Sequence, residues 1–132
     1  MKRIIYTDKA PAPIGPYSQA VEFGGVLYVS GQVAINPVSG DLVLGDIRSE
    51  TRQVMENLKA ILTASEIGFE HVLKTTIFLA NMEDFAAVNE IYGSYFEGNF
   101  PARETVAVKT LPKLVHVEIS VIADALGNNL PY

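Results

Sequence analysis

Near its C-terminal end the chain contains the stretch VHVEISVIA, at residues 115–123. Valine, isoleucine or alanine occupies every odd-numbered position, whereas His116, Glu118 and Ser120 fall between them. Successive side chains of a strand point to opposite faces, so this pattern predicts a strand with one apolar and one mixed face. Glutamate is depleted in strands and costly to bury unpaired, which makes Glu118 a candidate functional residue. The alternative is a structural salt bridge to Arg103, Lys109 or a neighbour.

Upstream of this stretch, β-type composition predicts five further strands. They are expected at residues 3–7, 17–23, 26–33, 72–79 and 103–110. Gly24-Gly25 predicts a tight turn between the second and third strands, and Pro112-Lys113 a hairpin turn between the last two.

Apolar residues at helical spacing predict two helices, at residues 46–66 and 84–96. Asp46 is the expected N-cap of the first helix, and Gly68 its expected stop. Asn81 or Asp84 could cap the second helix, and Gly98 is expected to end it.

The resulting order, β-β-β-α-β-α-β-β, predicts an α+β fold. We expect one domain over residues 1–132, with a single mixed sheet and both helices on one of its faces. The other face is then left uncovered, which implies a partner, and self-association is the simplest one.

Both predicted hairpins bring polar residues together. A turn at Gly24-Gly25 pairs Gln19 with Ser30 and Tyr17 with Gln32. A two-residue turn at Pro112-Lys113 pairs Ala107 with Glu118, Thr105 with Ser120, and Arg103 with Ile122. Arg103 and Glu118 are then expected on the same face, with their backbones roughly 14 Å apart. Taken alone, Arg103 could be a surface arginine, and Tyr17 and Ser30 ordinary sheet residues.

Composition excludes several classes of protein. The 132 residues contain no cysteine, so disulfides, thiolate metal sites and a cysteine nucleophile are absent. The formal net charge of −5 argues against a dedicated nucleic-acid binder. His71 and His116 are too few for a metal site, and no phosphate-cradling loop is recognisable. No apolar run has the length of a membrane span, and we expect a soluble, cytoplasmic protein.

A set of short motifs along almost the whole chain resembles the Rid family of reactive intermediate deaminases, also called the YjgF family. The motifs are APIGPYSQA at 12–20, YVSGQ at 28–32, DFAAVN at 84–89 with Tyr92, FPAR at 100–103, LPK at 111–113 and VEI at 117–119. The chain is most similar to the RidA branch, the enamine and imine deaminases. The resemblance implies a chorismate-mutase-like fold and a homotrimer whose sheets face inward.

The resemblance also implies active sites between subunits and a role for particular residues. Arg103 matches the family's carboxylate-binding arginine, and Glu118 matches its water-handling glutamate. The substrate-binding residues are Tyr17, Ser30, Gly31, Asn89 and Thr105, the last in place of a cysteine whose main chain contacts the ligand. The implied reaction converts small anionic 2-enamino and 2-imino acids, such as 2-aminoacrylate, 2-iminopropionate and 2-iminobutyrate, to 2-keto acids and ammonia without a cofactor.

One departure from the family pattern is Glu104, which follows the arginine where many members have a small residue. Strand alternation points it away from Arg103, although its charge weakens the attraction for an anionic substrate. Two other functions stay open on the sequence. The first is a binding or chaperone-like trimer without turnover, and the second is an RNA-acting enzyme, which the net charge disfavours.

Overall fold

The computed structural model of the protein describes residues 1–127. Its strands are β1 (Arg3–Ile5), β2 (Ala20–Phe23), β3 (Val26–Gln32), β4 (Val72–Leu79), β5 (Ala102–Ala107) and β6 (Val117–Asp124). Its α-helices are α1 (Ile47–Ala64) and α2 (Phe85–Gly93), and its 3₁₀ turns are η1 (Phe69–His71), η2 (Met82–Asp84) and η3 (Pro112–Leu114). The expected order of strands and helices is confirmed.

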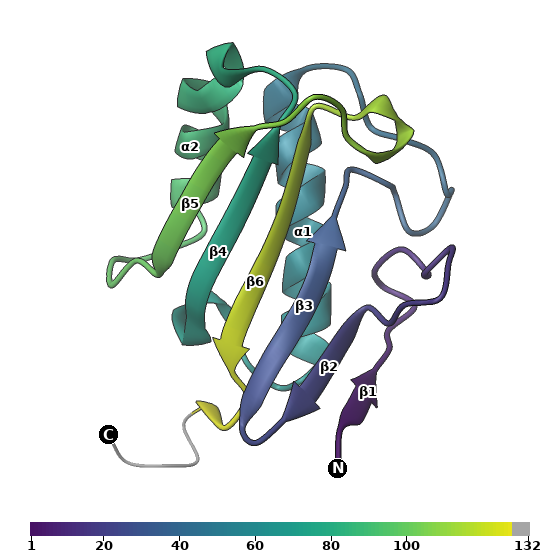
Figure 1. The fold of residues 1–132 in the computed structure, drawn as a ribbon, viewed down its shortest axis with the longest axis vertical. Helices are drawn as coiled ribbons and strands as arrows, with labels where there is room; N and C mark the ends of the chain where they lie inside the picture. Colours follow the sequence, from purple (N-terminus) through teal and green to yellow (C-terminus); the bar gives the residue numbers. More distant parts are fainter. Residues whose placement is uncertain (128–132) are drawn as a thin grey trace.

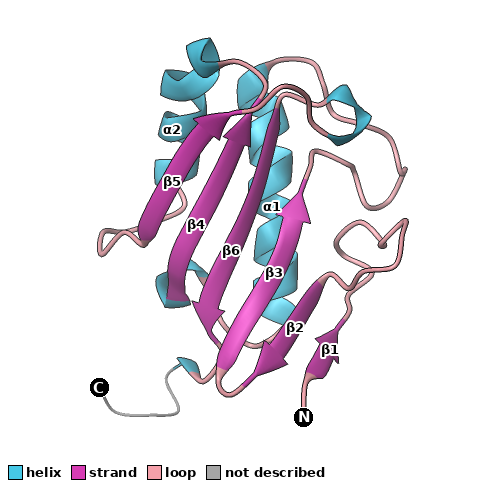
Figure 2. Ribbon diagram, in the orientation of Figure 1, coloured by secondary structure: helices cyan, strands magenta, loops and turns pink. Residues whose placement is uncertain are grey.

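The six strands form one mixed sheet in the order β1-β2-β3-β6-β4-β5. All neighbours are antiparallel except β4 and β5, which are parallel. Figures 1 and 2 show both helices behind the sheet and its other face open. The predicted α+β architecture, with one covered and one uncovered face, is therefore confirmed. Within residues 1–127, neither helix is long and apolar enough to cross a membrane.

The core lies between the sheet and the helices. In β6 the odd-numbered side chains from Val117 to Ala123 are buried, as the alternation predicts. They meet the apolar side of α1, which buries Val54, Met55, Leu58, Ile61 and Leu62. One face of β6 is thus fixed against α1, which leaves Glu118 and Ser120 on the open face.

Helix α1 begins and ends with recognisable caps. The Asp46 side chain accepts a hydrogen bond of 2.9 Å from the Ser49 N–H, which also lowers the pKa of Asp46. At the C-terminal end the Ile67 N–H donates to the Leu62 carbonyl at 3.1 Å, and Glu66 has a left-handed φ of 61°. This is a Schellman ending, so the helix stops before the predicted Gly68.

The Gly24-Gly25 turn is confirmed. The two glycines have φ values of 61° and 81°, which a tight hairpin turn requires. Phe23 pairs with Val26 and Val21 with Tyr28, in the expected register.

The predicted hairpin between β5 and β6 is wrong, because β4 lies between these two strands. The physical reason is Pro112. Two-residue hairpin turns need a positive φ at their first central residue, which the proline ring forbids. The segment instead forms η3, followed by a crossing to the far side of β4. The expected pairing of Arg103 with Ile122, and the spacing calculated from it, are wrong for the same reason.

The second helix is shorter than predicted. Asn81 caps η2 by accepting from the Glu83 N–H, and α2 ends at Gly93 rather than near Gly98. Tyr95 and Phe96, which lie within the predicted range of 84–96, follow the helix and pack on Phe69, each with a ring-centroid distance of 5.4 Å. The backbone here tightens to 3₁₀-type hydrogen bonds, from the Tyr95 N–H to the Tyr92 carbonyl and from the Phe96 N–H to the Gly93 carbonyl, each 3.2 Å long, and aromatic packing holds the segment in place.

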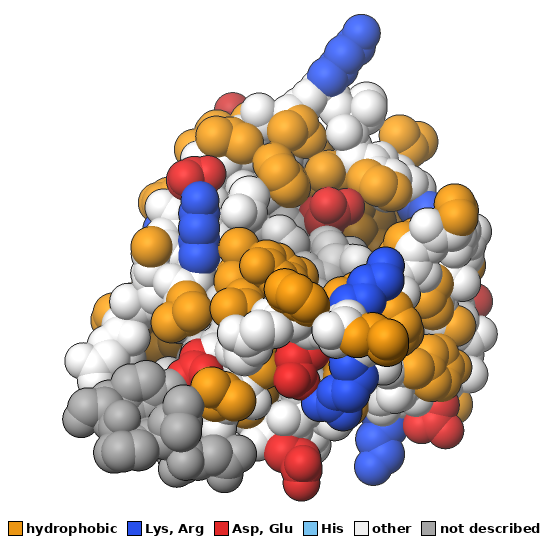
Figure 3. Space-filling model, turned by 60° about the horizontal axis from the view of Figure 1, so that its bottom comes forward, with side chains coloured by type: hydrophobic (Ala, Val, Ile, Leu, Met, Phe, Trp, Pro, Cys, Tyr) orange, Lys and Arg blue, Asp and Glu red, His pale blue; other side chains and the backbone are white. Residues whose placement is uncertain are grey.

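The open face carries exposed apolar side chains. Ile4, Phe23, Tyr28 and Val106 are among its large exposed apolar residues, contributed by strands across the whole width of the sheet. Figure 3 shows hydrophobic side chains in several groups on the surface turned toward the viewer, with charged side chains between them. Such a surface favours association with a second protein surface.

Glu66→Gly should stabilise the protein. A left-handed φ is unfavourable for glutamate and free of strain for glycine, so we expect the free energy of unfolding to rise by about 0.5–1 kcal/mol. Urea denaturation at fixed protein concentration measures this as a higher midpoint with an unchanged slope. Lys59→Gly, in the exposed middle of the same helix, is the control and should lower the free energy by about 1 kcal/mol. A lower midpoint for Glu66→Gly would contradict the assignment.

Candidate functional site

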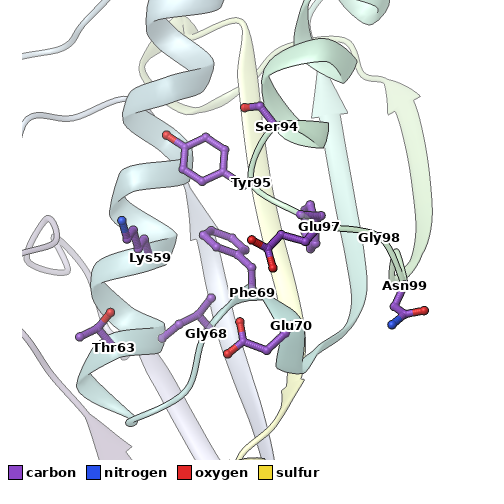
Figure 4. A pocket seen from close by; sticks show the side chains of 12 residues that line it. Lys59, Thr63, Gly68, Phe69, Glu70, Ser94, Tyr95, Glu97, Gly98 and Asn99 are labelled. Atoms are coloured by element: carbon purple, nitrogen blue, oxygen red, sulfur yellow. The ribbon is translucent and has the colours of Figure 1, made fainter.

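A large cleft formed by the described residues contains none of the candidate site residues predicted from the sequence. It has a volume of about 590 Å³ and lies between α1, η1 and the segment after α2. Figure 4 shows Lys59 and Thr63 on one side of it, Glu70 and Glu97 on the other, and Phe69 between them. Size alone therefore does not locate the candidate site.

A second pocket, of about 430 Å³, gathers most of the predicted polar residues. Its lining includes Tyr17, Gln19, Ser30, Gly31, Gln32 and Glu118. Its apolar wall comes from Pro11, Ala12, Ile14, Val33, Ile35 and Pro112. A few convergent polar groups against an apolar wall are typical of a small-molecule site. We call this pocket the Glu118 pocket.

Glu118 lies directly over Gly31. A Cβ atom built on Gly31 would come within 2.5 Å of the Glu118 Oε2 atom, so only glycine leaves room for the carboxylate. The register between β3 and β6 shifts between Val29 and Gln32, which places Gly31 in an irregular part of the ladder. Irregularities of this kind often redirect a side chain beside a functional site.

The Glu118 carboxylate is half-buried, and this burial raises its pKa above the ordinary value. Within residues 1–127 no lysine, arginine or histidine forms a salt bridge with it. The structural alternative, a salt bridge to Arg103 or Lys109, is thus not present in this part of the chain. A carboxylate with a raised pKa is better suited to accept a proton near neutral pH.

The other polar residues of the pocket differ in how they are held. The Ser30 hydroxyl donates to the Ser18 carbonyl at 2.6 Å, and the Ser30 N–H donates to the Gln19 carbonyl at 2.9 Å. Tyr17 precedes β2 and is 51% exposed, so the predicted strand pairing with Gln32 does not form. The buried Gln19 side chain binds the N-terminal loop through the Thr7 N–H and carbonyl, at 2.7 and 2.9 Å.

Arg103 lies in a separate cleft with α2. Its Nη1 donates to the Asn89 Oδ1 at 2.7 Å, and its Cζ lies 5.6 Å from the Phe85 ring centroid and 5.2 Å from that of Tyr92. The cleft, of about 460 Å³, is also lined by Gly93, Phe100 and Pro101. The amide and the two rings hold the guanidinium in one orientation, which suits recognition of a planar anion. We call this the Arg103 cleft.

The neighbours of Arg103 on β5 point alternately to the two faces. Glu104 pairs with Thr76 and its carboxylate lies 3.0 Å from Lys74 Nζ, away from Arg103 as expected. Thr105 pairs with Ile77, and its buried hydroxyl has no hydrogen-bond partner in the described structure.

Arg103 and Glu118 lie on opposite faces of the sheet, which corrects the expectation that they share one. Arg103 pairs with the buried Thr75, on the face that the helices cover. Glu118 pairs with Phe78, three residues further along β4 and therefore on the open face. One chain thus brings Tyr17, Ser30 and Gly31 to Glu118, and Asn89 to Arg103, but does not join the two groups.

Two residues of these pockets belong to motifs quoted from the sequence but were given no role there. Lys113 lines the Glu118 pocket with a left-handed φ of 56°, and Tyr92 supports the Arg103 cleft while its hydroxyl donates to Thr75 Oγ1 at 2.9 Å. The LPK and Tyr92 motifs drew attention to both, but only the fold shows what they face. Within residues 1–127, no three His, Asp or Glu side chains are grouped so that they could hold a metal ion.

Comparison with known proteins adds a family to this geometry. A family model described as Endoribonuclease L-PSP matches residues 7–125. A mouse protein named 2-iminobutanoate/2-iminopropanoate deaminase is 50% identical over 123 residues, which cover 93% of this chain and 91% of the mouse protein. The chain belongs to the Rid (YjgF) family.

Solved structures agree with this assignment. A Rid family protein from Yersinia pestis is 51% identical, with a TM-score of 0.92 over 94% of this chain and 99% of that one. E. coli TdcF, solved with bound serine, is 38% identical, with a TM-score of 0.89 over 92% of this Rid protein and 98% of TdcF. The resemblance seen in the sequence motifs is therefore confirmed, and with it the fold.

Gly31→Ala should displace the Glu118 carboxylate. The added methyl group occupies the position of Oε2, so the flexible side chain must turn toward water, and the pKa of Glu118 should fall toward its ordinary value. Titration of the glutamate side-chain carbons by NMR measures this. Gly45→Ala is the control, because a Cβ there meets nothing within 4 Å. An unchanged Glu118 pKa in Gly31→Ala would show that the close approach does not hold the carboxylate.

Proposed function

We propose that this protein hydrolyses 2-imino acids and their enamine tautomers to 2-keto acids and ammonia. The observation that carries the proposal is the division of the polar residues between the Glu118 pocket and the Arg103 cleft. One offers a proton acceptor and the other a carboxylate anchor, and neither is sufficient alone. The mouse relative named for this reaction supports the choice of substrate.

Arg103 supplies the recognition step in this proposal. A guanidinium forms two parallel hydrogen bonds with a carboxylate, a geometry that lysine cannot reproduce. Asn89 and the rings of Phe85 and Tyr92 keep the guanidinium in place before the substrate arrives. The anionic substrate therefore binds by its carboxylate, with its C=N group directed toward the residues of the Glu118 pocket.

Glu118 supplies the chemical step. It takes a proton from a water molecule, whose oxygen adds to the imine carbon, and passes this proton to the imine nitrogen, so that a carbinolamine forms. It then takes the hydroxyl proton of the carbinolamine and gives it to the nitrogen as the C–N bond breaks, so that ammonia leaves, the C=O bond of the keto acid forms and Glu118 is a carboxylate again. In this proposal Tyr17 and Ser30, which line the Glu118 pocket, hydrogen-bond the water or the substrate. Thr105, two residues after Arg103 on β5, contacts the substrate through its main chain.

In our proposal the Glu118 pocket and the Arg103 cleft meet when chains assemble into a homotrimer with the open faces inward. Two features support this. The open face carries exposed apolar residues, and β5, which bears Arg103, is an edge strand. An edge strand presents unpaired backbone groups that a second chain can cover. Arg103 of one subunit then faces Glu118 of its neighbour.

Two other functions belong to different classes. A binding or chaperone-like trimer would use the same pockets without turnover. The description of the matching family names an endoribonuclease, and RNA cleavage would require RNA binding that weakens steeply with salt. The net charge of −5 opposes binding of RNA, which requires an extended basic surface. A small anionic substrate requires only the local positive charge of Arg103.

Arg103→Lys should lower kcat/KM for 2-iminopropionate by about 10- to 100-fold, the equivalent of one charge-assisted hydrogen bond. The charge remains, but the bidentate fork is lost. The imine is generated in situ by an amino-acid oxidase, and release of the keto acid is followed. Lys59→Arg, in the exposed middle of α1, is a control for altered surface cations. Near-normal activity of Arg103→Lys would show that this residue is not the carboxylate anchor.

Glu118→Gln separates catalysis from binding. The amide keeps the shape and hydrogen bonding of the side chain but cannot accept a proton from water, so turnover should fall about 10²- to 10⁴-fold. Calorimetric titration with pyruvate should show binding at least as tight as in the wild type, because a negative charge near an anionic ligand is removed. Unchanged turnover would indicate a binding module instead.

Mixing these two impaired variants tests the whole proposal. Subunits of Arg103→Lys and Glu118→Gln are unfolded together in equal amounts and refolded, and their mass is measured by sedimentation. If each site takes Arg103 and Glu118 from different subunits, about a quarter of the sites in random trimers hold both. Activity should return to about that fraction of the wild type. The double variant mixed with itself is the blank. A stable 14.4 kDa monomer, or no recovery in the mixture, would contradict a shared site.

A further inference from the structure

A buried glutamate outside both pockets is the starting point. Glu50 lies in the first turn of α1, is 1% exposed, and points its carboxylate at the beginning of β6. Its Oε2 accepts from the His116 N–H at 2.7 Å and the Val117 N–H at 3.1 Å, while its Oε1 lies 2.8 Å from His116 Nδ1. One carboxylate thus binds both residues that precede Glu118.

The place of this contact explains why a side chain is needed there. The ladder between β3 and β6 ends at the pair Gln32 and Ile119, and that between β4 and β6 ends at Leu79 and Val117. The backbone N–H groups of His116 and Val117 lie at or beyond these ends, and buried amides require an acceptor. Glu50 replaces the missing strand partner.

Glu118 is consequently fixed from both sides along the chain. After it, Ile119 is held in the ladder by Gln32 and Ile77. Before it, Val117 pairs with Leu79 at the end of the ladder and its N–H is bound by Glu50. The backbone that carries the carboxylate into its place over Gly31 has little freedom to move, and displacements of about 1 Å at a reacting group can cost as much as 10²-fold in rate.

We propose that Glu50 is a positioning residue that keeps Glu118 in its working place by binding the main chain of His116 and Val117. This inference rests on the proposed function of Glu118. Glu50 acts through the two backbone contacts, and the His116 ring adds a third hydrogen bond to them. The ring side chain is 49% exposed, whereas the carboxylate is enclosed, so the ring is the more dispensable partner.

Glu50→Asp tests the proposal while the charge is kept. The shorter side chain draws the carboxylate away from both N–H groups. We expect kcat for imine hydrolysis to fall about 10- to 100-fold with KM changed less than about twofold, because carboxylate recognition belongs to Arg103. Glu56→Asp is the matched control. It lies on the same helix and accepts from the Tyr95 hydroxyl at 2.7 Å, so it should leave both parameters unchanged.

Two further variants show which contact matters. His116→Ala removes the ring and keeps both backbone bonds, so its kcat should stay within about threefold of the wild type. Glu50→Gln offers an amide oxygen to the same N–H groups, and a ring nitrogen of His116 can accept from the amide nitrogen. This variant should therefore keep most of the wild-type activity, unlike Glu50→Asp. A larger loss in His116→Ala than in Glu50→Asp, or wild-type kcat in Glu50→Asp, would overturn the proposal.

A second measurement does not depend on turnover. In Glu50→Asp the amides of His116 and Val117 should exchange with solvent faster. The NMR titration of Glu118 should also move toward the ordinary glutamate pKa, since the charge at position 50 is unchanged and only the placement differs. If the wild type hydrolyses no imine, the proposed function fails, and this titration alone decides on Glu50. An unchanged Glu118 titration in Glu50→Asp would refute the positioning role, and so would an equal shift in Glu56→Asp.

Discussion

Insertion of β6 between β3 and β4 is the constraint on which the rest of the structure depends. It gives the last strand hydrogen-bonded neighbours on both edges and places its apolar side chains against α1. The same insertion puts Glu118 beside β3, where Gly31 leaves space for the carboxylate. It also separates β5 from β6, so that Arg103 lies on the edge of the sheet with α2. Core and candidate site are thus two results of one strand order.

Local patterns in the sequence were sufficient to predict most of the strands and helices. The alternation in residues 115–123 predicted the buried face of β6, and Gly24-Gly25 predicted both the turn and its register. These features depend on neighbours within a few residues. Helix ends were less accurate. Glu66 adopts the left-handed conformation in which glycine was expected, and after α2 the backbone tightens to 3₁₀-type hydrogen bonds while Tyr95 and Phe96 pack on Phe69.

The strand order could not be read from local patterns. Two strands that are adjacent in the chain and joined by a short turn suggest a hairpin. Only the fixed φ of Pro112, which forbids a two-residue hairpin turn, indicates otherwise. That single error moved Arg103 to the wrong face. The family motifs singled out Arg103 and Glu118 but contain no information on which face each occupies. The part played by Glu50 had no signal in the sequence, since a glutamate early in a helix is ordinary.

The position of Arg103 and Glu118 on opposite faces has a consequence for how activity responds to concentration. If the working site is shared between chains, the isolated chain is inactive, and dissociation at high dilution removes activity without unfolding any protein. The rate would then fall more steeply than in proportion to the amount of protein once assembly is incomplete. A cell could in this way set the activity through the abundance of the chain, with no additional ligand or modification.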